Sequence, residues 1–298
     1  MKLVSVIIPT YKRSDMLDNA IDSVLKQTYS EIEIIVVDDN NPNTDERLAT
    51  EKKMLKYSSN PRVKYIKHEK NKNGSAARNT GIKAAQGEYI CFLDDDDCYY
   101  PEKTQKEVDY LNDHKNYDGV YCWREDISGI TAGKYDGDIS EILLADKYMP
   151  GTTTLMFRRD VFKNVLFDES FRRHQEVEFL IRFCEKYKIG HIEYIGVKSD
   201  ISDRRNVLHG KDLEKNKKLY IDTFRNKIES IKKKNRQAGS EIYIHHYVDI
   251  IADHVQNGYI GSAFKYFMIS CKESFPLTIY KMIDHVRAYI RAHKGAKK

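Results

Sequence analysis

Residues 87–101 read GEYICFLDDDDCYYP, and the rest of the chain is interpreted outward from this stretch. Gly87 suits the end of a helix, because a left-handed residue often follows the last turn. Tyr89 to Leu93 is a short apolar run with aromatic residues, which is typical of a strand buried on both faces. Four consecutive aspartates, residues 94–97, then stand at the carboxyl end of that strand, the edge of an open α/β sheet where ligands bind.

The four adjacent carboxylates repel one another, so a folded protein keeps them together only with a compensating cation or with full solvation. A divalent metal ion on oxygen ligands, shared with a substrate phosphate, accounts for the cluster. The alternative is a solvated acidic loop, which the buried strand directly before it disfavours. The sequence therefore predicts a metal site at residues 94–97.

Length and composition set the broad class of the protein. A chain of 298 residues can hold one large domain or one and a half. Its formal net charge of +5 gives no indication of nucleic-acid binding, although lysine and arginine crowd the last third. Five cysteines without a CxxC pair argue against disulfides and zinc. No apolar run reaches the ~18 residues of a spanning helix. We expect a cytoplasmic protein, soluble or peripheral at the inner face of the cell membrane.

Strands and helices alternate over the first two hundred residues. Expected strands are Leu3–Ile8, Ile32–Val37, Arg62–Lys67, Glu88–Leu93, Gly119–Trp123 and Thr152–Phe157, with helices over Asp45–Tyr57, Ser75–Ala85 and Glu176–Tyr187. This order predicts an α/β fold with a mainly parallel, doubly wound sheet. Ile192–Val197 is expected as an edge strand. From Lys211 onward the pattern is helical, so we expect domains at 1–210 and 211–298.

Three familiar phosphate-binding classes are disfavoured by their missing motifs. No G-x-G-x-x-G follows the first strand, and no G-x-x-x-x-G-K-[ST] occurs. A phosphatase of the haloacid dehalogenase type would have Gly-Thr after its aspartates, where this chain has Asp97-Cys98.

Several segments, in order, resemble family 2 glycosyltransferases. They are Val4–Tyr11, Gln27–Tyr29, Val36–Asp39, Ala76–Gly81 and Gly87–Asp97. The resemblance covers about residues 3 to 205 and implies a GT-A fold, with a nucleotide-sugar-binding half, an acceptor half and an Asp-x-Asp metal site. The C-terminal third lies outside the resemblance, and we expect it to be a basic helical extension.

The resemblance also implies how the aspartates divide the work. Asp94 and Asp96 are similar to the family's ligands for Mn²⁺ or Mg²⁺, with Asp96 as the first choice, and Asp95 is similar to the residue that contacts the ribose. Asp97 is expected to cap the helix that follows Pro101.

On the nucleotide, the resemblance implies that Asp39 accepts a hydrogen bond from the base and that Tyr11 stacks on it. Pro9 and Thr10 would offer backbone contacts. Arg78 would neutralise phosphate as a fixed fork. Each has a simpler alternative: Asp39 as a loop cap, Tyr11 as strand-end packing, and Arg78 as a salt bridge to the aspartates.

The family's Glu-Asp pair before an apolar helix corresponds here to Gln175-Glu176, which implies that Glu176 is the base that deprotonates the acceptor. As an alternative, Glu176 is a first-turn acid that favours the helix dipole. The chain also departs from the family at Asn40–Asn43, where Asp-Gly-Ser is usual. Arg204, Arg205 and His209 either close over the diphosphate or form a solvated basic loop.

The resulting prediction is an inverting, metal-dependent glycosyltransferase for surface polysaccharide of the bacterial type. Its donor would be a nucleoside diphosphate sugar, with a UDP-sugar favoured, and its acceptor a glycan or a lipid-linked sugar. One rival is a sugar-phosphate nucleotidyltransferase, whose glycine-rich, arginine-bearing N-terminal loop is missing here. The other is a non-catalytic nucleotide-sugar-binding module.

The last predicted helix, Thr278–Ile290, is amphipathic. Its apolar face carries Ile279, Met282, Ile283, Val286 and Ile290, with Lys281, Arg287, Arg291 and Lys294 nearby. Such a helix lies in a membrane interface, or packs against the catalytic domain or a second subunit of a homodimer.

Overall fold

The computed structural model describes residues 1–171, 173–200 and 208–295. The chain divides into two compact units, which are described separately. The first comprises Met1–Ser140 and Tyr148–Asp203, and the second comprises Glu141–Lys147 and Arg204–Lys298. The second unit thus includes a short segment from the middle of the chain, and the expected domain boundary near residue 210 stays a prediction.

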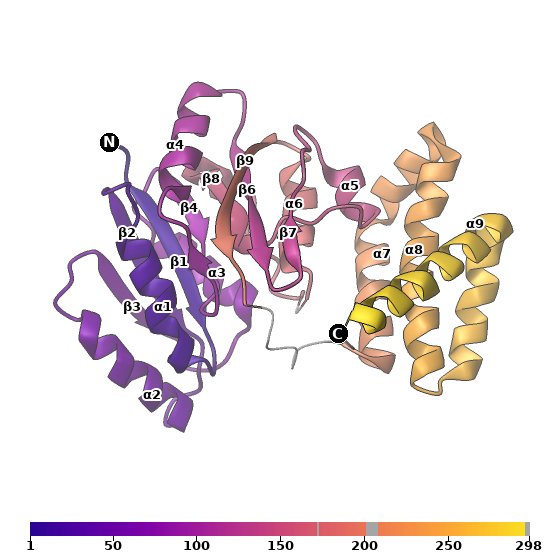
Figure 1. The fold of residues 1–298 in the computed structure, drawn as a ribbon, viewed down its shortest axis with the longest axis horizontal. Coiled ribbons are helices and arrows are strands. Elements are labelled where there is room, and N and C mark those ends of the chain that lie inside the picture. The colour runs from indigo at the N-terminus through magenta and orange to yellow at the C-terminus, as the bar shows by residue number, and fades with distance from the viewer. Residues whose placement is uncertain (172, 201–207, 296–298) are drawn as a thin grey trace. The chain divides into compact units, whose positions relative to one another are not determined.

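A single mixed sheet runs through the first unit (Figure 1). Its strand order is β3-β2-β1-β4-β8-β6-β9-β5, with β7 paired to β6. The bounds are β1 Val4–Thr10, β2 Ile32–Asp38, β3 Val63–Lys67, β4 Tyr89–Phe92, β5 Cys98–Tyr99, β6 Gly119–Asp126, β7 Gly129–Thr131, β8 Leu155–Arg158 and β9 Ile189–Lys198. The first four strands are parallel, whereas β8 is antiparallel to both of its neighbours.

The strand expected over residues 192–197 is present, but the prediction that it lies at the edge of the sheet is wrong. These residues belong to β9, which lies between β6 and the two-residue β5. A sequence pattern for one strand does not reveal β5, because Cys98 and Tyr99 are too few to show a periodicity.

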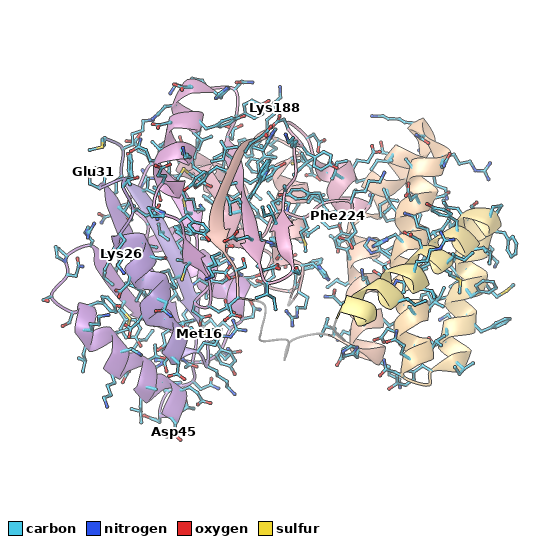
Figure 2. The ribbon with its side chains drawn as sticks, in the orientation of Figure 1. Met16, Lys26, Glu31, Asp45, Lys188 and Phe224 are labelled. Atoms are coloured by element: carbon cyan, nitrogen blue, oxygen red, sulfur yellow. The ribbon has the colours of Figure 1, made fainter. Side chains whose placement is uncertain are left out.

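Helices cover both faces of the sheet. In the first unit they are α1 Ser14–Leu25, α2 Asp45–Met54, α3 Gly74–Ala84, α4 Lys103–Asp113 and α6 Gln175–Phe183, with short 3₁₀ turns at Leu55–Tyr57, Thr152–Thr154 and Arg159–Lys163. Val6 and Ile8 belong to one core cluster with residues of α1 and α4, while Ile35 and Val37 pack with Ala77 of α3. Side chains fill the space between these layers (Figure 2). Burial on both faces explains why β1, β2 and β4 are nearly continuous apolar runs.

The second unit is helical, as predicted from Lys211 onward. It contains α7 Gly210–Lys234, α8 Arg236–Gln256 and α9 Ile260–Gly295, and α5 Ser140–Leu144 begins at its boundary. The backbone is extended at Ser274, two residues before Pro276, so α9 consists of two helical halves. Within the described part of the chain, no helix has the length and apolar character needed to cross a membrane.

Candidate active site

The aspartates after β4 lie beside the end of β1, because these two strands are parallel neighbours. Thr10 Oγ1 donates a hydrogen bond to Asp95 Oδ2 over 2.7 Å, and the backbone N–H of Tyr11 donates to the same oxygen over 3.3 Å. Asp95 is buried. The structure therefore brings together Thr10, Tyr11 and the aspartate cluster at the carboxyl edge of the sheet, where ligands bind in open α/β sheets.

Two arginines also reach the cluster. Arg13 Nη1 lies 2.5 Å from Asp96 Oδ2 and 3.4 Å from Asp95 Oδ1. Arg78 Nη2 lies 2.6 Å from Asp94 Oδ1. The salt bridge that we considered as the alternative role of Arg78 is thus present. Arg13 did not emerge from the sequence, because a single cation after a strand carries no distinguishing pattern.

The carboxylates of the cluster are costly to ionise together, even with the two arginines beside them. Burial raises the pKa of Asp95 to about 7, against the opposing effect of the Thr10 hydrogen bond. Burial and the charge of Asp94 raise the pKa of Asp96 to about 6, and the same two causes raise that of Asp97 to about 8. Carboxylate oxygens are the ligands that Mg²⁺ and Mn²⁺ prefer. A bound divalent cation would favour the ionised form of these carboxyl groups, so the donor set fits such a cation.

Asp97 does not cap a helix, and that prediction was wrong. It accepts hydrogen bonds from the backbone N–H of Asp200 over 3.0 Å and from Ser199 Oγ over 3.3 Å, at the end of β9. The residue at the N-cap of α4 is Glu102, whose side chain makes no capping hydrogen bond. Asp97 instead ties the aspartate loop to β9.

The segment before α4 is held by Gln27, from the motif Gln27–Tyr29. Its Nε2 donates to the carbonyl of Tyr100 over 2.9 Å, and its Oε1 accepts from the N–H of Thr104 over 3.0 Å. The N–H of Thr28 donates to the carbonyl of Pro101 over 2.9 Å. These residues therefore fix the chain just after the aspartates.

Asp39 is buried beside the end of β2, and four protein groups lie within hydrogen-bonding distance of its carboxylate. His68 Nδ1 lies 2.7 Å and the N–H of Lys72 2.8 Å from Oδ1, while Asn71 Nδ2 and the N–H of Asn73 lie 2.8 and 2.9 Å from Oδ2. The carboxylate thus organises the loop that leads into α3. Its contact with a nucleotide base stays a prediction. A base that donates a hydrogen bond to Asp39 would share one of its carboxylate oxygens with these groups.

The ring of Tyr11 is 41% exposed, so a planar base has access to it. Lys12 Nζ lies 5.3 Å from the ring centroid. Pro9 is half-buried in β1, beyond the residues that pair with β4, where its missing N–H leaves no ladder bond unmade. Stacking by Tyr11 and backbone contacts from Pro9 and Thr10 stay predictions.

Arg78 also connects the aspartates to the start of α6. This buried guanidinium donates from Nη1 to Gln175 Oε1 over 2.8 Å, while Nη2 bonds Asp94 and the ring of Phe167 lies 5.7 Å away. Gln175 is the first residue of α6, and Glu176 follows it. The structure thus places the candidate base one residue from a side chain that is linked through Arg78 to the aspartate cluster.

The remaining candidate residues from the sequence lie either in the second unit or outside the described residues. His209 Nδ1 is 2.8 Å from Asp253 Oδ1 in the second unit, and Arg204 and Arg205 fall outside the described residues. Among the described residues, three potential metal-ligating side chains have converging ligand atoms only at Asp146, His245 and Asp249, again in the second unit. The ammonium of Lys217 lies 2.6 Å from Asp249, so this group already has a cation.

The comparisons with known proteins give the family of the chain. The model of the family described as Glycosyl transferase family 2 matches residues 5–171. The chain belongs to glycosyl transferase family 2. An uncharacterized glycosyltransferase of Rickettsia typhi is 34% identical over 214 residues, which cover 67% of this chain and 64% of that protein. The amylovoran biosynthesis glycosyltransferase AmsB of Erwinia amylovora is 28% identical over 190 residues, covering 60% and 62%.

Solved structures of two other proteins share the fold. TarS of S. aureus, in complex with UDP-GlcNAc, has a TM-score of 0.59 at 16% identity, over 96% of this chain and 92% of that one. The mannosyltransferase PcManGT of Pyrobaculum calidifontis, with GDP-Man and Mn²⁺, has a TM-score of 0.61 at 15% identity, over 97% and 81%. The GT-A fold of this family 2 chain is therefore confirmed. The chain spans 31% to 64% of the length of the first four curated relatives.

Proposed function

We propose that this chain is an inverting, metal-dependent hexosyltransferase that moves a sugar from a UDP-sugar to a glycan or lipid-linked acceptor in surface polysaccharide synthesis. The observation that carries the proposal is the link from Asp94 through Arg78 to Gln175, beside Glu176. It joins the acidic cluster suited to a metal-bound diphosphate to the helix that bears a candidate base.

In this proposal each side chain has one task. Asp96 and Asp94 hold Mn²⁺ or Mg²⁺, which when bound would neutralise charge on the departing diphosphate. Asp95 orients the ribose. Glu176 accepts the proton of the acceptor hydroxyl as that oxygen attacks the anomeric carbon, and the nucleoside diphosphate leaves from the opposite face. A single displacement inverts the configuration at that carbon.

The rival functions differ in their reactants. A nucleotidyltransferase requires a nucleoside triphosphate, and a binding module turns over nothing. Family membership supports the transferase, and the relatives bind UDP-GlcNAc or GDP-Man. Incubation with UDP-sugar and Mn²⁺, followed by chromatography for UDP, separates the transferase from both rivals. UDP release without a triphosphate supports the proposal, and its absence with every nucleotide sugar and acceptor would contradict it.

The change Asp96→Asn should abolish most of the Mn²⁺-dependent rise in melting temperature measured with UDP. An amide keeps the size of the carboxylate but removes its charge, so the cation loses a ligand and UDP loses its stabilising partner. The check is a thermal-shift titration with Mn²⁺ at fixed UDP. Asp160→Asn, a highly exposed aspartate, removes the same charge elsewhere and should behave as wild type. Full metal-dependent turnover by Asp96→Asn would show that the ligand assignment is wrong.

We also propose that the helical unit binds an anionic membrane surface, where a lipid-linked acceptor is found. Of the predicted apolar face, Ile279 and Met282 are half-buried. Ile283, Val286 and Ile290, here called the exposed stripe of α9, are 47%, 55% and 45% exposed among the described residues. Lys281 forms an ion pair with Glu241 of α8, with 2.7 Å between its Nζ and Glu241 Oε1. Residues 208–298 carry 18 lysines and arginines against nine aspartates and glutamates. An exposed apolar stripe on a strongly basic unit complements anionic lipid.

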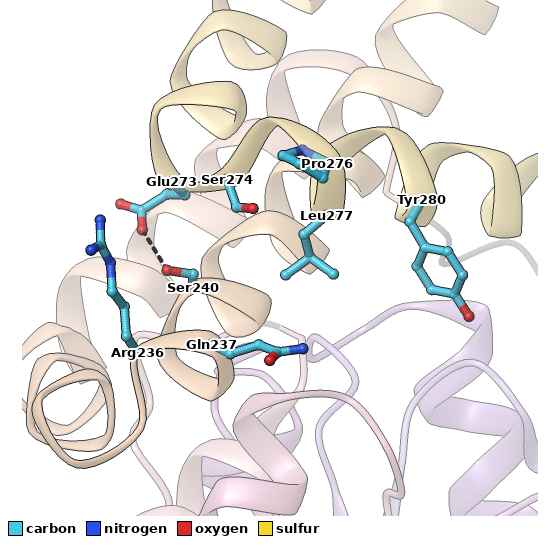
Figure 3. Close-up of a pocket in the computed structure, with 8 residues that line it drawn as sticks. All are labelled: Arg236, Gln237, Ser240, Glu273, Ser274, Pro276, Leu277 and Tyr280. Carbon is cyan, nitrogen blue, oxygen red and sulfur yellow. Dashed lines mark hydrogen bonds between the residues drawn. The ribbon is translucent and has the colours of Figure 1, made fainter.

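A second feature of this unit is a pocket whose lining includes both a cation and a carboxylate, Arg236 and Glu273. The pocket, of about 600 Å³, lies between the start of α8 and the kink in α9 (Figure 3). Exposed Arg236 stands at one side of it and exposed Tyr280 at the other. Leu277 lines the pocket between them. The mixture of a cation, an aromatic ring and aliphatic groups suits the headgroup region of a bilayer.

Vesicles that contain phosphatidylglycerol should carry the protein upward in a flotation gradient, and 0.5 M salt should reduce the bound fraction because it screens the charges. The double change Ile283→Ser and Val286→Ser should reduce binding by about 30- to 150-fold, since it removes roughly 2–3 kcal/mol of apolar burial. Leu48→Ser, which alters an exposed leucine of α2, should bind as wild type. A folded protein that does not bind the vesicles, but sediments as a dimer that forms through this exposed stripe, would contradict the membrane proposal.

A further inference from the structure

Arg13 makes the closest contact of any cation with the candidate metal ligands in the described part of the chain. Its Nη1 lies between Asp96 and Asp95, at 2.5 and 3.4 Å. It occupies the N-cap position of α1, and Lys12 before it has a φ of 60°. The guanidinium therefore supplies positive charge at the position where the proposed function places a metal ion.

Each of the three carboxylates is engaged by a protein group, and Arg13 Nη1 reaches both Asp95 and Asp96. Asp94 is bound to Arg78, Asp95 to Thr10 and Tyr11, and Asp96 to Arg13. Consistent with this, the ligand atoms of these aspartates are not among those that converge to within 4.8 Å in the described chain. A divalent cation bound to Asp96 would lie close to the Arg13 guanidinium. Two positive charges at hydrogen-bonding distance from the same carboxylate repel strongly.

We propose that Arg13 is a positioning residue that holds Asp95 and Asp96 before the cation binds and then turns to the donor's diphosphate. The proposal rests on the proposed function, because it requires a metal ion and a nucleotide at this site. Arg13 competes with the cation for Asp96, so it lowers metal affinity in the absence of nucleotide. Once displaced, it lies beside the developing anion, and a guanidinium matches phosphate oxygens as a two-pronged donor.

Arg13 and Arg78 differ in how far their side chains are exposed. Arg78 is buried, bridges Gln175 and Asp94, and lies against the ring of Phe167, so its position is fixed from several sides. The side chain of Arg13 is 20% exposed and projects from the junction between a loop and a helix. Arg13 is thus the more exposed of the two arginines and the more accessible to a diphosphate, while Arg78 keeps Asp94 in place.

The proposal predicts effects of opposite sign in two binding experiments. Calorimetric titration with Mn²⁺ alone should give Arg13→Gln an affinity about three- to tenfold higher than that of the wild type, because a competing cation is gone. Titration with UDP at saturating Mn²⁺ should give the same variant an affinity about tenfold lower, because a charge-assisted hydrogen bond is lost. Arg13→Lys keeps the charge without the two-pronged geometry. In both experiments its affinity should lie between those of the wild type and Arg13→Gln.

Lys52→Gln is the matched control, because it removes one positive charge from an exposed position on α2. It should change neither affinity by more than about twofold, given screening at physiological salt. Unchanged or weaker Mn²⁺ binding by Arg13→Gln, with the wild type binding Mn²⁺, overturns the role of Arg13 and leaves the metal site standing. Tighter Mn²⁺ binding with unchanged UDP binding overturns the diphosphate contact. Absence of Mn²⁺ binding in every variant overturns both the metal site and this proposal.

Discussion

Glu176→Gln should lower the rate of sugar transfer by about 10²- to 10⁴-fold, the range expected when a general base is lost. Glutamine keeps the size and hydrogen-bonding capacity of the side chain but does not accept the proton of the acceptor hydroxyl. Affinities for UDP and Mn²⁺ should stay within about twofold of the wild type, because the contacts with the donor are untouched. The measurement combines initial rates of transfer with calorimetric titration of UDP and Mn²⁺.

Two neighbouring acids help to interpret that result. Glu185→Gln alters an exposed carboxylate just after α6 and should transfer sugar as the wild type does. Glu178 is a poor substitute base, because it is buried and its Oε2 already accepts a hydrogen bond from Arg182 Nη2 over 2.8 Å. A Glu176→Gln variant that transfers sugar at the parental rate would refute the assignment, and Glu178 would then be tested.

Lys103→Met should reduce the free energy of unfolding by about 3–5 kcal/mol, which is the usual cost of leaving one partner of a buried ion pair alone. Lys103 Nζ lies 2.7 Å from Glu107 Oε2, and both side chains are fully buried at the start of α4. Lys103 Nζ also lies 4.2 Å from the centroid of the Tyr99 ring. The measurement is urea denaturation followed by circular dichroism.

The loss should depend on pH in a definite direction. Burial raises the pKa of Glu107 to about 7 even with the ammonium beside it, and removing Lys103 raises it further. The folded variant then binds a proton that the unfolded chain releases, so its stability falls as the pH rises above the ordinary glutamate value. The deficit relative to the wild type should be larger at pH 8.5 than at pH 6.

Two controls make this test specific. Lys106→Met removes a lysine with the same spacing to its partner, Glu102, but on the surface, and should cost about 0.5 kcal/mol or less. The double change Lys103→Met and Glu107→Leu should recover most of the lost stability, because no buried charge remains. A single variant as stable as the wild type at both pH values would contradict the buried pair.

Local patterns were sufficient to predict much of the fold. The alternation of apolar strands with amphipathic helices depends on residues close in sequence, which is why the elements around β1, β2, β4 and α3 were predicted correctly. The aspartate cluster was predicted at a strand end for the same reason. The position of β9 was not, since its neighbour β5 has only two residues.

The site contains contacts that a single sequence does not reveal. Asp97 binds partners 102 and 103 residues away, so nothing near it in the chain indicated that role. Arg13 donates to Asp96, and Gln175 accepts from Arg78, across similar separations along the sequence. Such pairings arise from the topology of the sheet and become visible only in the folded chain.

The segment Glu141–Lys147 has a consequence for the order in which the protein is made. Its buried Leu143 and Leu144 belong to the helical unit, and Asp146 and Lys147 pair with His245 and Glu241 of α8. During synthesis these leucines leave the ribosome well before α7 and α8 exist, and contacts between distant parts of a chain form late. The nascent chain therefore carries an exposed apolar patch until its last third emerges, and a ribosome that stops near residue 207 releases a product in which that patch stays uncovered.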